Sequence, residues 1–373
     1  MAEARRAGRI RVDLTLSNPT AAGFFYPQTL STAWSNAHSL DYTPSSLGLP
    51  SARQAVLDAH PFLPPRPDRL LLTASTSEAY AFLFKLLCDA GDRVLAPAPS
   101  YPLIEHLAAL EGVYVDRYPL HDAGRWTLDL GHLEASLTPR TRAIVIVAPN
   151  NPTGSVPTPD EWAALADCAA RHRLPLIVDE VFAPYVFDDI HVQADAATAM
   201  SPETLVFRMG GLSKLVGLPQ AKLAWTSIDG PDDLVDAALA RLEMIADTYL
   251  SVSTPVQLAL PALLAEGAVV RAQIQQRLRR NLDGLAARVA RDGMLSLRRP
   301  HGGWTAVLRA PAVGDPDALV RTLLREGVLV HPAYFYDFAH DGYLVVSLLT
   351  PPAEFDEGLE LLSQVLLAES VST

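Results

Sequence analysis

Lysine and cysteine are scarce in this sequence of 373 residues. Three of the 30 basic residues are lysines, Lys85, Lys214 and Lys222, and the others are arginines. Arginine keeps its proton near neutral pH, whereas a lysine can be deprotonated and act as a nucleophile, so amine chemistry must come from these three positions. The two cysteines, Cys88 and Cys168, lie in apolar patterns and form neither a disulfide framework nor a metal-binding set. We therefore expect core cysteines, no metal site and a reducing compartment.

Long apolar runs and basic runs are missing as well. No segment approaches the roughly 20 apolar residues of a membrane span, and the arginines in residues 1–16 are followed by no apolar signal segment. The net charge of -12 and the pI near 5.3 disfavour nucleic acid and anionic membranes as partners. With 49% hydrophobic residues, the chain can bury a large core. These features predict a folded, cytoplasmic protein whose partners are small molecules.

The middle of the chain alternates short apolar runs with capped helices. After a proline-rich break at 61–67, Ser75 and Thr158 each precede a glutamate by three residues, which is the spacing of a helix N-terminal capping box. The run at 143–148 is apolar without interruption, as in a strand buried in a parallel sheet. Strands are predicted at 70–73, 93–96, 113–118, 143–148, 176–179, 205–208 and 222–227, and helices at 50–59, 76–89, 159–173, 234–247 and 255–291. This alternation predicts an α/β fold with a large, doubly wound and mostly parallel sheet.

The C-terminal part predicts a second, smaller unit. Short strands are predicted at 306–308, 328–330 and 343–348, with a helix at 316–326. Residues 1 to about 45 fit no regular period and carry several prolines, so we expect an arm that packs on a larger body. We predict a large domain at 46–275 and a small α+β domain built from the N-terminal arm, 1–45, and the C-terminal region, 276–373.

Several polar residues directly follow predicted strands. Asn151, Asp179, Lys214 and the hydroxyl residues at 75–77 each lie after a strand end. Ligands of open α/β sheets bind at the carboxyl ends of the strands, so one crevice can collect all of these side chains. Taken singly, each has an ordinary explanation, namely a glycine-rich loop around Lys214, a turn at Asn151, and caps at Asp179 and Ser75.

Together these motifs form an ordered pattern along nearly the whole chain. The pattern comprises Tyr42 with Gly48 and Arg53, Ser75-Thr76-Ser77-Glu78-Ala79, Pro99-Ser100-Tyr101-Pro102, Asn150-Asn151-Pro152-Thr153-Gly154, Asp179-Glu180-Val181-Phe182, and Ser213-Lys214 to Lys222. In order and spacing it resembles the class I/II aminotransferases of fold type I, which use pyridoxal 5′-phosphate. The resemblance implies an enzyme that acts as a homodimer on an amino acid and a 2-oxo acid.

The resemblance gives most of these residues a role at the cofactor. Lys214 is expected to hold the cofactor as a Schiff base and to move a proton at the substrate carbon, and Asp179 to pair with the pyridinium nitrogen. The helix N-terminus at 75–77 suits the phosphate through its dipole and amides. The expected catalytic residues are Lys214, Asp179 and Tyr101. The further expected contacts are Ser75, Thr76 and Ser77 with the phosphate, Asn151 with the ring O3′, Tyr101 stacked on the ring, Lys222 and Gly211 beside the phosphate, and Tyr42 with the phosphate of the neighbouring subunit.

Four positions depart from the family pattern. Lys222 stands in place of an arginine that grips the phosphate, and Gly211 in place of a serine or threonine. Phe182 replaces a tyrosine that donates to O3′, so we expect a higher Schiff-base pKa than in relatives. Val345 stands where the family carries the arginine that clamps the substrate carboxylate.

The missing arginine leaves the substrate open. Arg208 and Asn18 are the candidates to bind the carboxylate, or else the substrate is not a standard α-amino acid. Aromatic clusters around Tyr26, at Trp304 and at 334–336 suggest an apolar substrate side chain or, equally, a packed domain interface.

Transamination, in which an amino group moves between an amino acid and a 2-oxo acid through Lys214, is the leading functional hypothesis. A pyridoxal-phosphate-dependent lyase or decarboxylase is the alternative, because the sequence does not fix which substrate bond lies perpendicular to the ring. A ligand sensor on the same scaffold is disfavoured by the retained Lys214 and Asp179. A nicotinamide-dependent dehydrogenase is disfavoured because no Gly-x-Gly-x-x-Gly follows an early strand.

Overall fold

The computed structural model describes residues 8–187, 203–250, 252–310 and 316–371. Its largest element is a sheet of eight described strands in the order β2-β9-β8-β7-β6-β3-β4-β5. The five neighbours β8, β7, β6, β3 and β4 run parallel, whereas β2, β9 and β5 pair antiparallel at the two sides. The strands are β2 (Leu70–Thr73), β3 (Arg93–Ala98), β4 (Tyr114–Asp122), β5 (Trp126–Leu128), β6 (Thr141–Val147), β7 (Leu176–Asp179), β8 (Val206–Gly211) and β9 (Ala224–Asp229). The predicted α/β fold with a mostly parallel sheet is confirmed.

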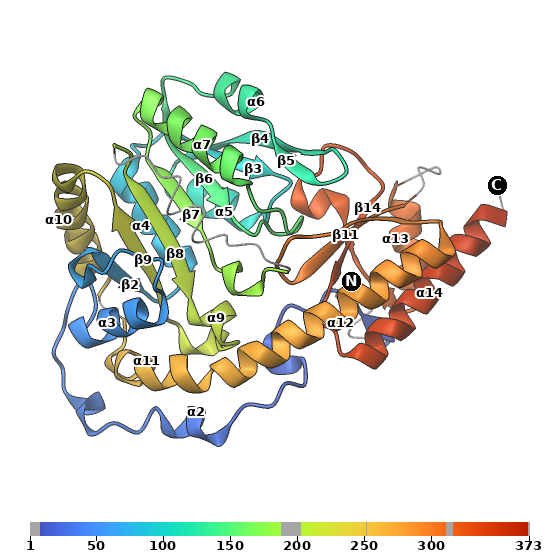
Figure 1. Ribbon diagram of the computed structural model, residues 1–373, viewed down its shortest axis with the longest axis horizontal. Helices are drawn as coiled ribbons and strands as arrows, with labels where there is room; N and C mark the ends of the chain where they lie inside the picture. Colours follow the sequence, from blue (N-terminus) through green and yellow to red (C-terminus); the bar gives the residue numbers. More distant parts are fainter. Residues whose placement is uncertain (1–7, 188–202, 251, 311–315, 372–373) are drawn as a thin grey trace.

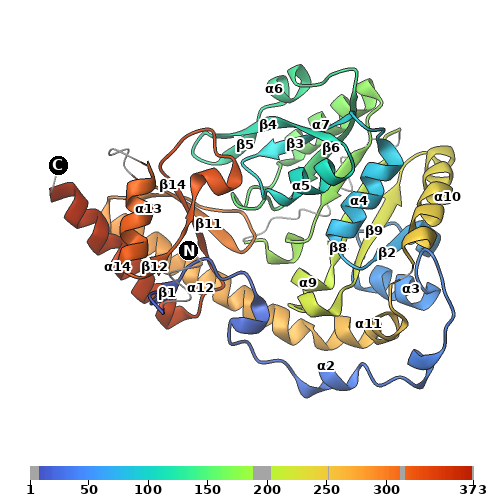
Figure 2. The ribbon, with the colours of Figure 1, turned by 180° about the vertical axis from the view of Figure 1, so that it is seen from behind.

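Helices cover both faces of this sheet because the central strands are apolar on both sides. In β6, Ala143 and Val145 pack into one core cluster, whereas Ile144 and Ile146 pack into another. The first cluster lies under α4 (Thr76–Leu87), α5 (Leu103–Leu110) and α10 (Asp232–Tyr249), and the second under α6 (Leu130–Ala135) and α7 (Pro159–His172). Figures 1 and 2 show the two helix layers from opposite sides. The sheet is therefore doubly wound.

A second sheet of four described strands forms the core of the smaller unit. Its order is β10-β11-β14-β13, and all of its pairs are antiparallel. The N-terminal arm joins this unit because β1 (Val12–Asp13) pairs in parallel with β12 (Val328–Leu329). The other elements of the unit are β10 (Ser296–Arg298), β11 (Thr305–Arg309), α13 (Pro316–Arg325), β13 (His331–Pro332), β14 (Tyr343–Ser347) and α14 (Pro352–Val371). The start of the arm is thus joined to the C-terminal region at β1, and the predicted assignment of all of residues 1–45 to the small domain stays a prediction.

The helix predicted at 255–291 is two helices in the structure, α11 (Thr254–Glu266) and α12 (Ala268–Asp292). Gly267 separates them, and a Cβ atom at this glycine would lie 2.4 Å from the Val216 side chain. Only glycine, which has no Cβ atom, allows this close approach of the backbone to Val216. Helix α12 then runs from α11 to the small unit (Figure 1), and the boundary predicted at residue 275 lies inside it. That boundary stays a prediction.

The remaining described elements are short. They are α2 (Gln28–Thr32), α3 (Pro50–Ala59), α9 (Leu212–Leu215) and the single-turn helices η1 (Pro19–Ala21), η2 (Ala37–Leu40), η3 (Pro67–Arg69), η4 (Ala183–Tyr185), η5 (Pro219–Ala221) and, beside β13, η6 (Ala333–Tyr336). Within the described ranges, no single helix has both the length and the hydropathy of a membrane span. Helices α10 and α11 reach those limits only as a pair, and the pair is bent by 117°.

Candidate active site

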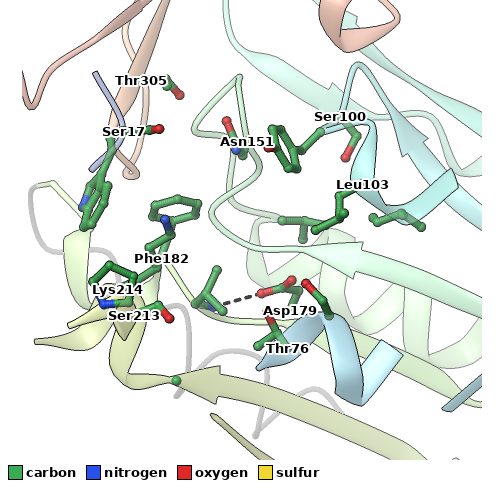
Figure 3. Close-up of a pocket in the computed structure, with 18 of the residues that line it drawn as sticks. Ser17, Thr76, Ser100, Leu103, Asn151, Asp179, Phe182, Ser213, Lys214 and Thr305 are labelled. Carbon is green, nitrogen blue, oxygen red and sulfur yellow. Dashed lines mark hydrogen bonds between the residues drawn. The ribbon is translucent and has the colours of Figure 1, made fainter. Parts of the chain in front are cut away.

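A cavity of about 550 Å³ lies between the carboxyl ends of the central strands and the four-stranded sheet. Figure 3 shows Lys214, Asp179, Asn151 and Thr76 around this space, with Thr305 on its far side. The size suits a cofactor together with a small substrate. The sequence-predicted residues that line the cavity are Ser75, Thr76, Ser77, Tyr101, Asn151, Asp179, Gly211, Lys214 and Lys222.

Lys214 lies on the one-turn helix α9, directly after β8. Its Nζ atom is 4.7 Å from the centre of the Trp304 ring and 5.5 Å from that of Phe182. The Tyr185 hydroxyl donates to the Lys214 carbonyl oxygen at 2.6 Å and fixes the backbone of this turn. Burial lowers the pKa of Lys214 to about 8, although the nearby Asp179 carboxylate favours the charged form. A larger fraction of this amine is therefore neutral, and nucleophilic, than in an exposed lysine.

Asp179 ends β7 and is buried. One carboxylate oxygen accepts from the Tyr80 hydroxyl at 3.0 Å, and the other accepts from the Val181 amide at 3.1 Å. Burial raises the pKa of Asp179 to about 6, against the opposing effects of these two hydrogen bonds. A carboxylate held at two points in a dry site can pair with a cationic ring nitrogen.

Tyr80 was not expected at the site. It lies four residues after Thr76 on α4, so both side chains project from the same helix face. This helical spacing was the one signal in the sequence that pointed to Tyr80.

The N-terminus of α4 opens into the cavity through residues that cap it. The Ser75 hydroxyl oxygen accepts from the Glu78 amide at 3.1 Å, and the Glu78 carboxylate accepts from the Ala74 amide at 2.6 Å. The predicted capping is therefore present, with the glutamate bonded one residue further back than in a full capping box. The first amides of a helix have no intrahelical acceptor, so those of Thr76 and Ser77 suit a phosphate.

Two residues predicted to lie beside the phosphate, Lys222 and Gly211, have constrained backbone positions. Lys222 was expected to begin a strand, but it has a left-handed backbone with φ of 53°, and β9 begins at Ala224. The turn still brings Lys222 to the cavity wall. A Cβ atom on Gly211 would lie 3.1 Å from the Ala224 Cβ, so a hydroxyl residue at 211 would need β9 to move.

Asn151 has a buried side-chain oxygen without a hydrogen-bond partner among the described residues. Its neighbour Asn150 fixes the loop by donating to the Pro99 carbonyl oxygen at 3.0 Å and to the Thr153 hydroxyl at 2.9 Å. A buried amide group without a protein partner is costly unless a ligand satisfies it. Because amide oxygen and nitrogen positions are interchangeable by a side-chain flip, Asn151 can present a donor to a ligand.

Aromatic rings and hydroxyl residues form the remaining wall. The Tyr101 ring lies 6.3 Å from Tyr336, and the Trp304 ring packs edge-on at 5.5 Å from Phe182. The aromatic clusters predicted at Trp304 and 334–336 thus contribute Trp304, Phe335 and Tyr336 to the cavity. Other polar lining residues were not expected from the sequence, namely Thr15, Ser17, Ser100, Ser213, Thr305, His331 and Ser347.

The expectation that Arg208 binds a substrate carboxylate was wrong. Arg208 is buried outside the cavity, where its guanidinium donates to Glu180 at 2.8 and 3.2 Å and to the Phe62 carbonyl oxygen at 3.1 Å. A buried ion pair of this kind cannot release its arginine without leaving an uncompensated charge. Arg208 therefore has a structural role.

Three further predicted residues are not part of the cavity wall. The Asn18 side chain accepts from the Thr20 amide and hydroxyl and caps η1. The Tyr26 hydroxyl donates to the Gly217 carbonyl oxygen at 2.7 Å, and burial raises the pKa of Tyr26 to about 12. Neither side chain lines the cavity, so the substrate contacts expected of Asn18 and Tyr26 gain no support and stay predictions. Tyr42 is 85% exposed, and its contact with a neighbouring subunit stays a prediction.

Val345 lies in the middle of β14 and is fully buried. It packs with Trp126, Val307 and Tyr343 in a small apolar cluster. No arginine is among the described residues that line the cavity. The departure seen in the sequence is thus a real feature of the site.

The doubly wound sheet, the small α+β unit, and the lysine and carboxylate at the strand ends define a protein of fold type I. The family model described as aminotransferase class I and II matches residues 31–362, and the chain belongs to this family. Alanine aminotransferase of Mycobacterium tuberculosis (strain H37Rv) is 30% identical over 258 residues, which are 67% of this chain and 59% of that protein.

A second curated relative and a solved structure are also similar to this chain. Glutamate-pyruvate aminotransferase AlaA of Escherichia coli K12 is 29% identical over 255 residues, which are 67% of this chain and 62% of that protein. The matches thus span less than two thirds of the length of these two curated relatives. The solved structure of alanine aminotransferase from Pyrococcus furiosus is 23% identical, with a TM-score of 0.90 over 98% of this chain and 95% of that chain, which confirms the fold.

Proposed function

We propose that this protein is an aminotransferase that uses pyridoxal 5′-phosphate to move an amino group between an amino acid and a 2-oxo acid. The observation that carries the proposal is that Lys214 and Asp179 lie in one cavity. Burial shifts the pKa of Lys214 to about 8 and that of Asp179 to about 6. An amine that is partly neutral and a carboxylate that is still ionised at neutral pH are the two groups that such a reaction needs.

The residues present fit the cofactor, as the unsatisfied buried amide oxygen of Asn151 indicates. Thr76 and Ser77 at the α4 N-terminus would hold the phosphate with Ser75, and Lys222 would add a positive charge. Asp179, steadied by Tyr80, would pair with the ring nitrogen. We also assign to Asn151 the contact with the ring oxygen and to Tyr101 the stacking on the ring.

Lys214 has two tasks in this proposal. Its amine would hold the cofactor, and as a free amine it would move a proton at the substrate carbon. The bound cofactor supplies an electron sink that acidifies that carbon. The rings of Trp304 and Phe182 beside Nζ keep water away from the amine.

We further infer a cytoplasmic homodimer in which Tyr42 reaches the phosphate of the neighbouring site. Leu40 and Tyr42 are 93% and 85% exposed, which suits a surface that a second subunit covers. The Ser46 hydroxyl donates to Asp247 at 3.0 Å, so this segment lies near the end of α10, where Leu250 is 73% exposed.

A half-reaction screen tests the function. Purified holoenzyme is mixed with single amino acids, beginning with alanine and glutamate because the named relatives are alanine and glutamate-pyruvate aminotransferases. We expect the visible absorbance of the lysine-bound cofactor to be replaced by that of its aminated form, with a stoichiometric 2-oxo acid. Release of carbon dioxide, or of pyruvate from a donor other than alanine, would favour the decarboxylase or lyase alternative. The named relatives do not suggest either one.

Borohydride trapping followed by peptide mapping tests the site. We expect the cofactor on Lys214, and K214A should lose the trapped product. K222A is the matched control, because Lys222 lines the same cavity and should keep the covalent link while binding the cofactor less tightly. A product on Lys85 or Lys222 would contradict the assignment.

A further inference from the structure

The small-domain wall of the cavity is one face of the four-stranded sheet. Residues directly opposite each other in an antiparallel pair project to the same side, and so do residues two apart in one strand. Thr305 pairs with Ser347, and Val345 pairs with His331 across the β13–β14 ladder. Thr305, Ser347, Val345 and His331 therefore share a face, and three of them line the cavity.

The two hydroxyl groups on this face already donate to the protein. The Thr305 hydroxyl donates to the Pro152 carbonyl oxygen at 2.8 Å, and the Ser347 hydroxyl donates to the Leu16 carbonyl oxygen. The Ser347 oxygen also accepts from the Leu349 amide at 3.1 Å. These groups cannot also donate to a substrate anion without giving up bonds that fix the loop and the arm.

His331 is the basic side chain that the four-stranded sheet contributes to the described cavity lining. The two other basic groups, Lys214 and Lys222, come from the segment after β8 on the opposite wall. The His331 ring stacks on Phe335 at 5.0 Å and meets the edge of Tyr336 at 5.7 Å, so aromatic packing fixes its orientation. His331 pairs with Val345 from the edge strand β13, so its imidazole lies next to the position that Val345 occupies in β14.

An amino acid and a 2-oxo acid both carry a carboxylate on the reacting carbon. Placing that charge in a cavity lined by rings is costly unless a cation or donor meets it. Building on the proposed function, we propose that His331 binds the substrate carboxylate and makes the enzyme select amino acids over amines that lack this group. His331 is thus a specificity-determining residue on the wall opposite Lys214.

Paired donors test this role. The holoenzyme half-reaction is measured with L-phenylalanine and with 2-phenylethylamine, which differ only in the carboxylate, and then with L-alanine and ethylamine. The variants H331N and H331Q run in parallel, so that the result does not depend on the folding of one variant, and cofactor absorbance confirms an intact site. His340, exposed after η6, provides the matched control H340N.

We expect H331N and H331Q to raise the KM for the amino acid about 10- to 100-fold, as for a lost charge-assisted hydrogen bond, with a smaller change in kcat. Both variants should leave the reaction of the amine unchanged, and H331R should restore the amino acid KM. H340N should behave as the wild type. An unchanged amino acid KM in both polar variants, or a wild-type enzyme that uses the amine as well as the acid, would overturn the inference while the aminotransferase proposal stands. If no donor converts the wild-type cofactor, the proposed function itself fails, and this inference fails with it.

Discussion

Asp179 and Lys214 bring opposite charges into one cavity, and burial disfavours the charged form of each. The pKa of Asp179 rises from 3.8 to about 6, and that of Lys214 falls from 10.5 to about 8. At neutral pH both groups are charged in the folded state at a cost to stability, which a bound cofactor would offset by pairing with them. The two residues proposed for the chemistry therefore lower the stability of the cofactor-free protein.

This conflict predicts the pH dependence of stability in the cofactor-free protein. Because the folded state holds the Asp179 proton more tightly than the unfolded state does, stability falls as pH rises from about 4 to about 6. The shift corresponds to a loss of the order of 3 kcal/mol above that range. For Lys214 the sign is opposite, so stability recovers as pH rises from about 8 to about 10.5.

Urea unfolding of cofactor-free wild type and D179N at a series of pH values measures this effect. We expect D179N to be more stable than the wild type at pH 7. Its stability should fall much less than that of the wild type between about pH 4 and about pH 6. The exposed Asp341 provides the control D341N, which should follow the wild-type profile. A D179N profile parallel to that of the wild type would contradict the assigned cause.

At the scale of elements, two helices share the same N-terminal chemistry but only one begins at the cavity. Ser75 caps α4 and Thr158 caps α7, and each hydroxyl oxygen accepts from the amide three residues on, at 3.1 and 3.2 Å. We predict that S75A and T158A each lower the free energy of unfolding by about 1 kcal/mol. S75A alone should also weaken cofactor binding, because its helix end faces the phosphate position. Chemical denaturation measures the effect on stability, and cofactor titration measures the effect on binding. Equal cofactor affinities of S75A and T158A would show that Ser75 does not contribute to cofactor binding.

Two glycines near α12 differ in the space available for a side chain. A Cβ on Gly267 would meet Val216 at 2.4 Å and the Leu263 carbonyl oxygen at 2.5 Å, whereas a Cβ on Gly284, inside α12, would meet nothing within 4 Å. G267A should therefore destabilise the protein by several times the roughly 1 kcal/mol that G284A gains from better helix propensity. Thermal unfolding of the two variants gives this comparison. A G267A protein as stable as the wild type would show that the contact with Val216 does not require glycine.

Local patterns in the sequence predicted the elements well where one residue decides the structure. Strands β2 and β7 have the predicted bounds, and α7 begins at the predicted cap with a full capping box. The close contact that requires glycine at position 267 could not be predicted, because its partner Val216 lies some fifty residues earlier. Arg208 was misassigned for a similar reason: its partner Glu180 becomes its neighbour only when β7 and β8 pair. Contacts between distant segments are not encoded in local periodicity.

At the scale of the whole molecule, the cavity is formed by segments that lie far apart in the sequence. Thr15 comes from the N-terminal arm, Asp179 from the large sheet, Lys214 from α9 directly after that sheet's strand β8, and Ser347 from the small sheet. The motif order identified the large-sheet residues because each follows a strand end. It could not identify Thr305, His331 or Ser347, because the register of the four-stranded sheet selects which of its residues face the cavity.

Whether the site also needs a second subunit is decided by mixing two defective proteins. K214A lacks the reacting amine, and Y42A lacks the side chain expected to reach the neighbouring phosphate. In a heterodimer, the Y42A chain supplies Lys214 and the K214A chain supplies Tyr42, so one of its two sites is complete. Random reassociation yields half heterodimers, so activity should recover to about a quarter of the wild-type value.

The matched mixture uses Y42A with a double variant, K214A/Y42A, which leaves every site without Tyr42 and should recover nothing. Activity is measured after the chains are unfolded together and refolded, because stable dimers exchange subunits slowly. If K214A with Y42A stays at the level of Y42A alone while a dimer is present, Tyr42 acts within its own chain or has no part in the site. Recovery only in the first mixture would show that each site is built from two chains and that Tyr42 acts in the active site of the partner subunit.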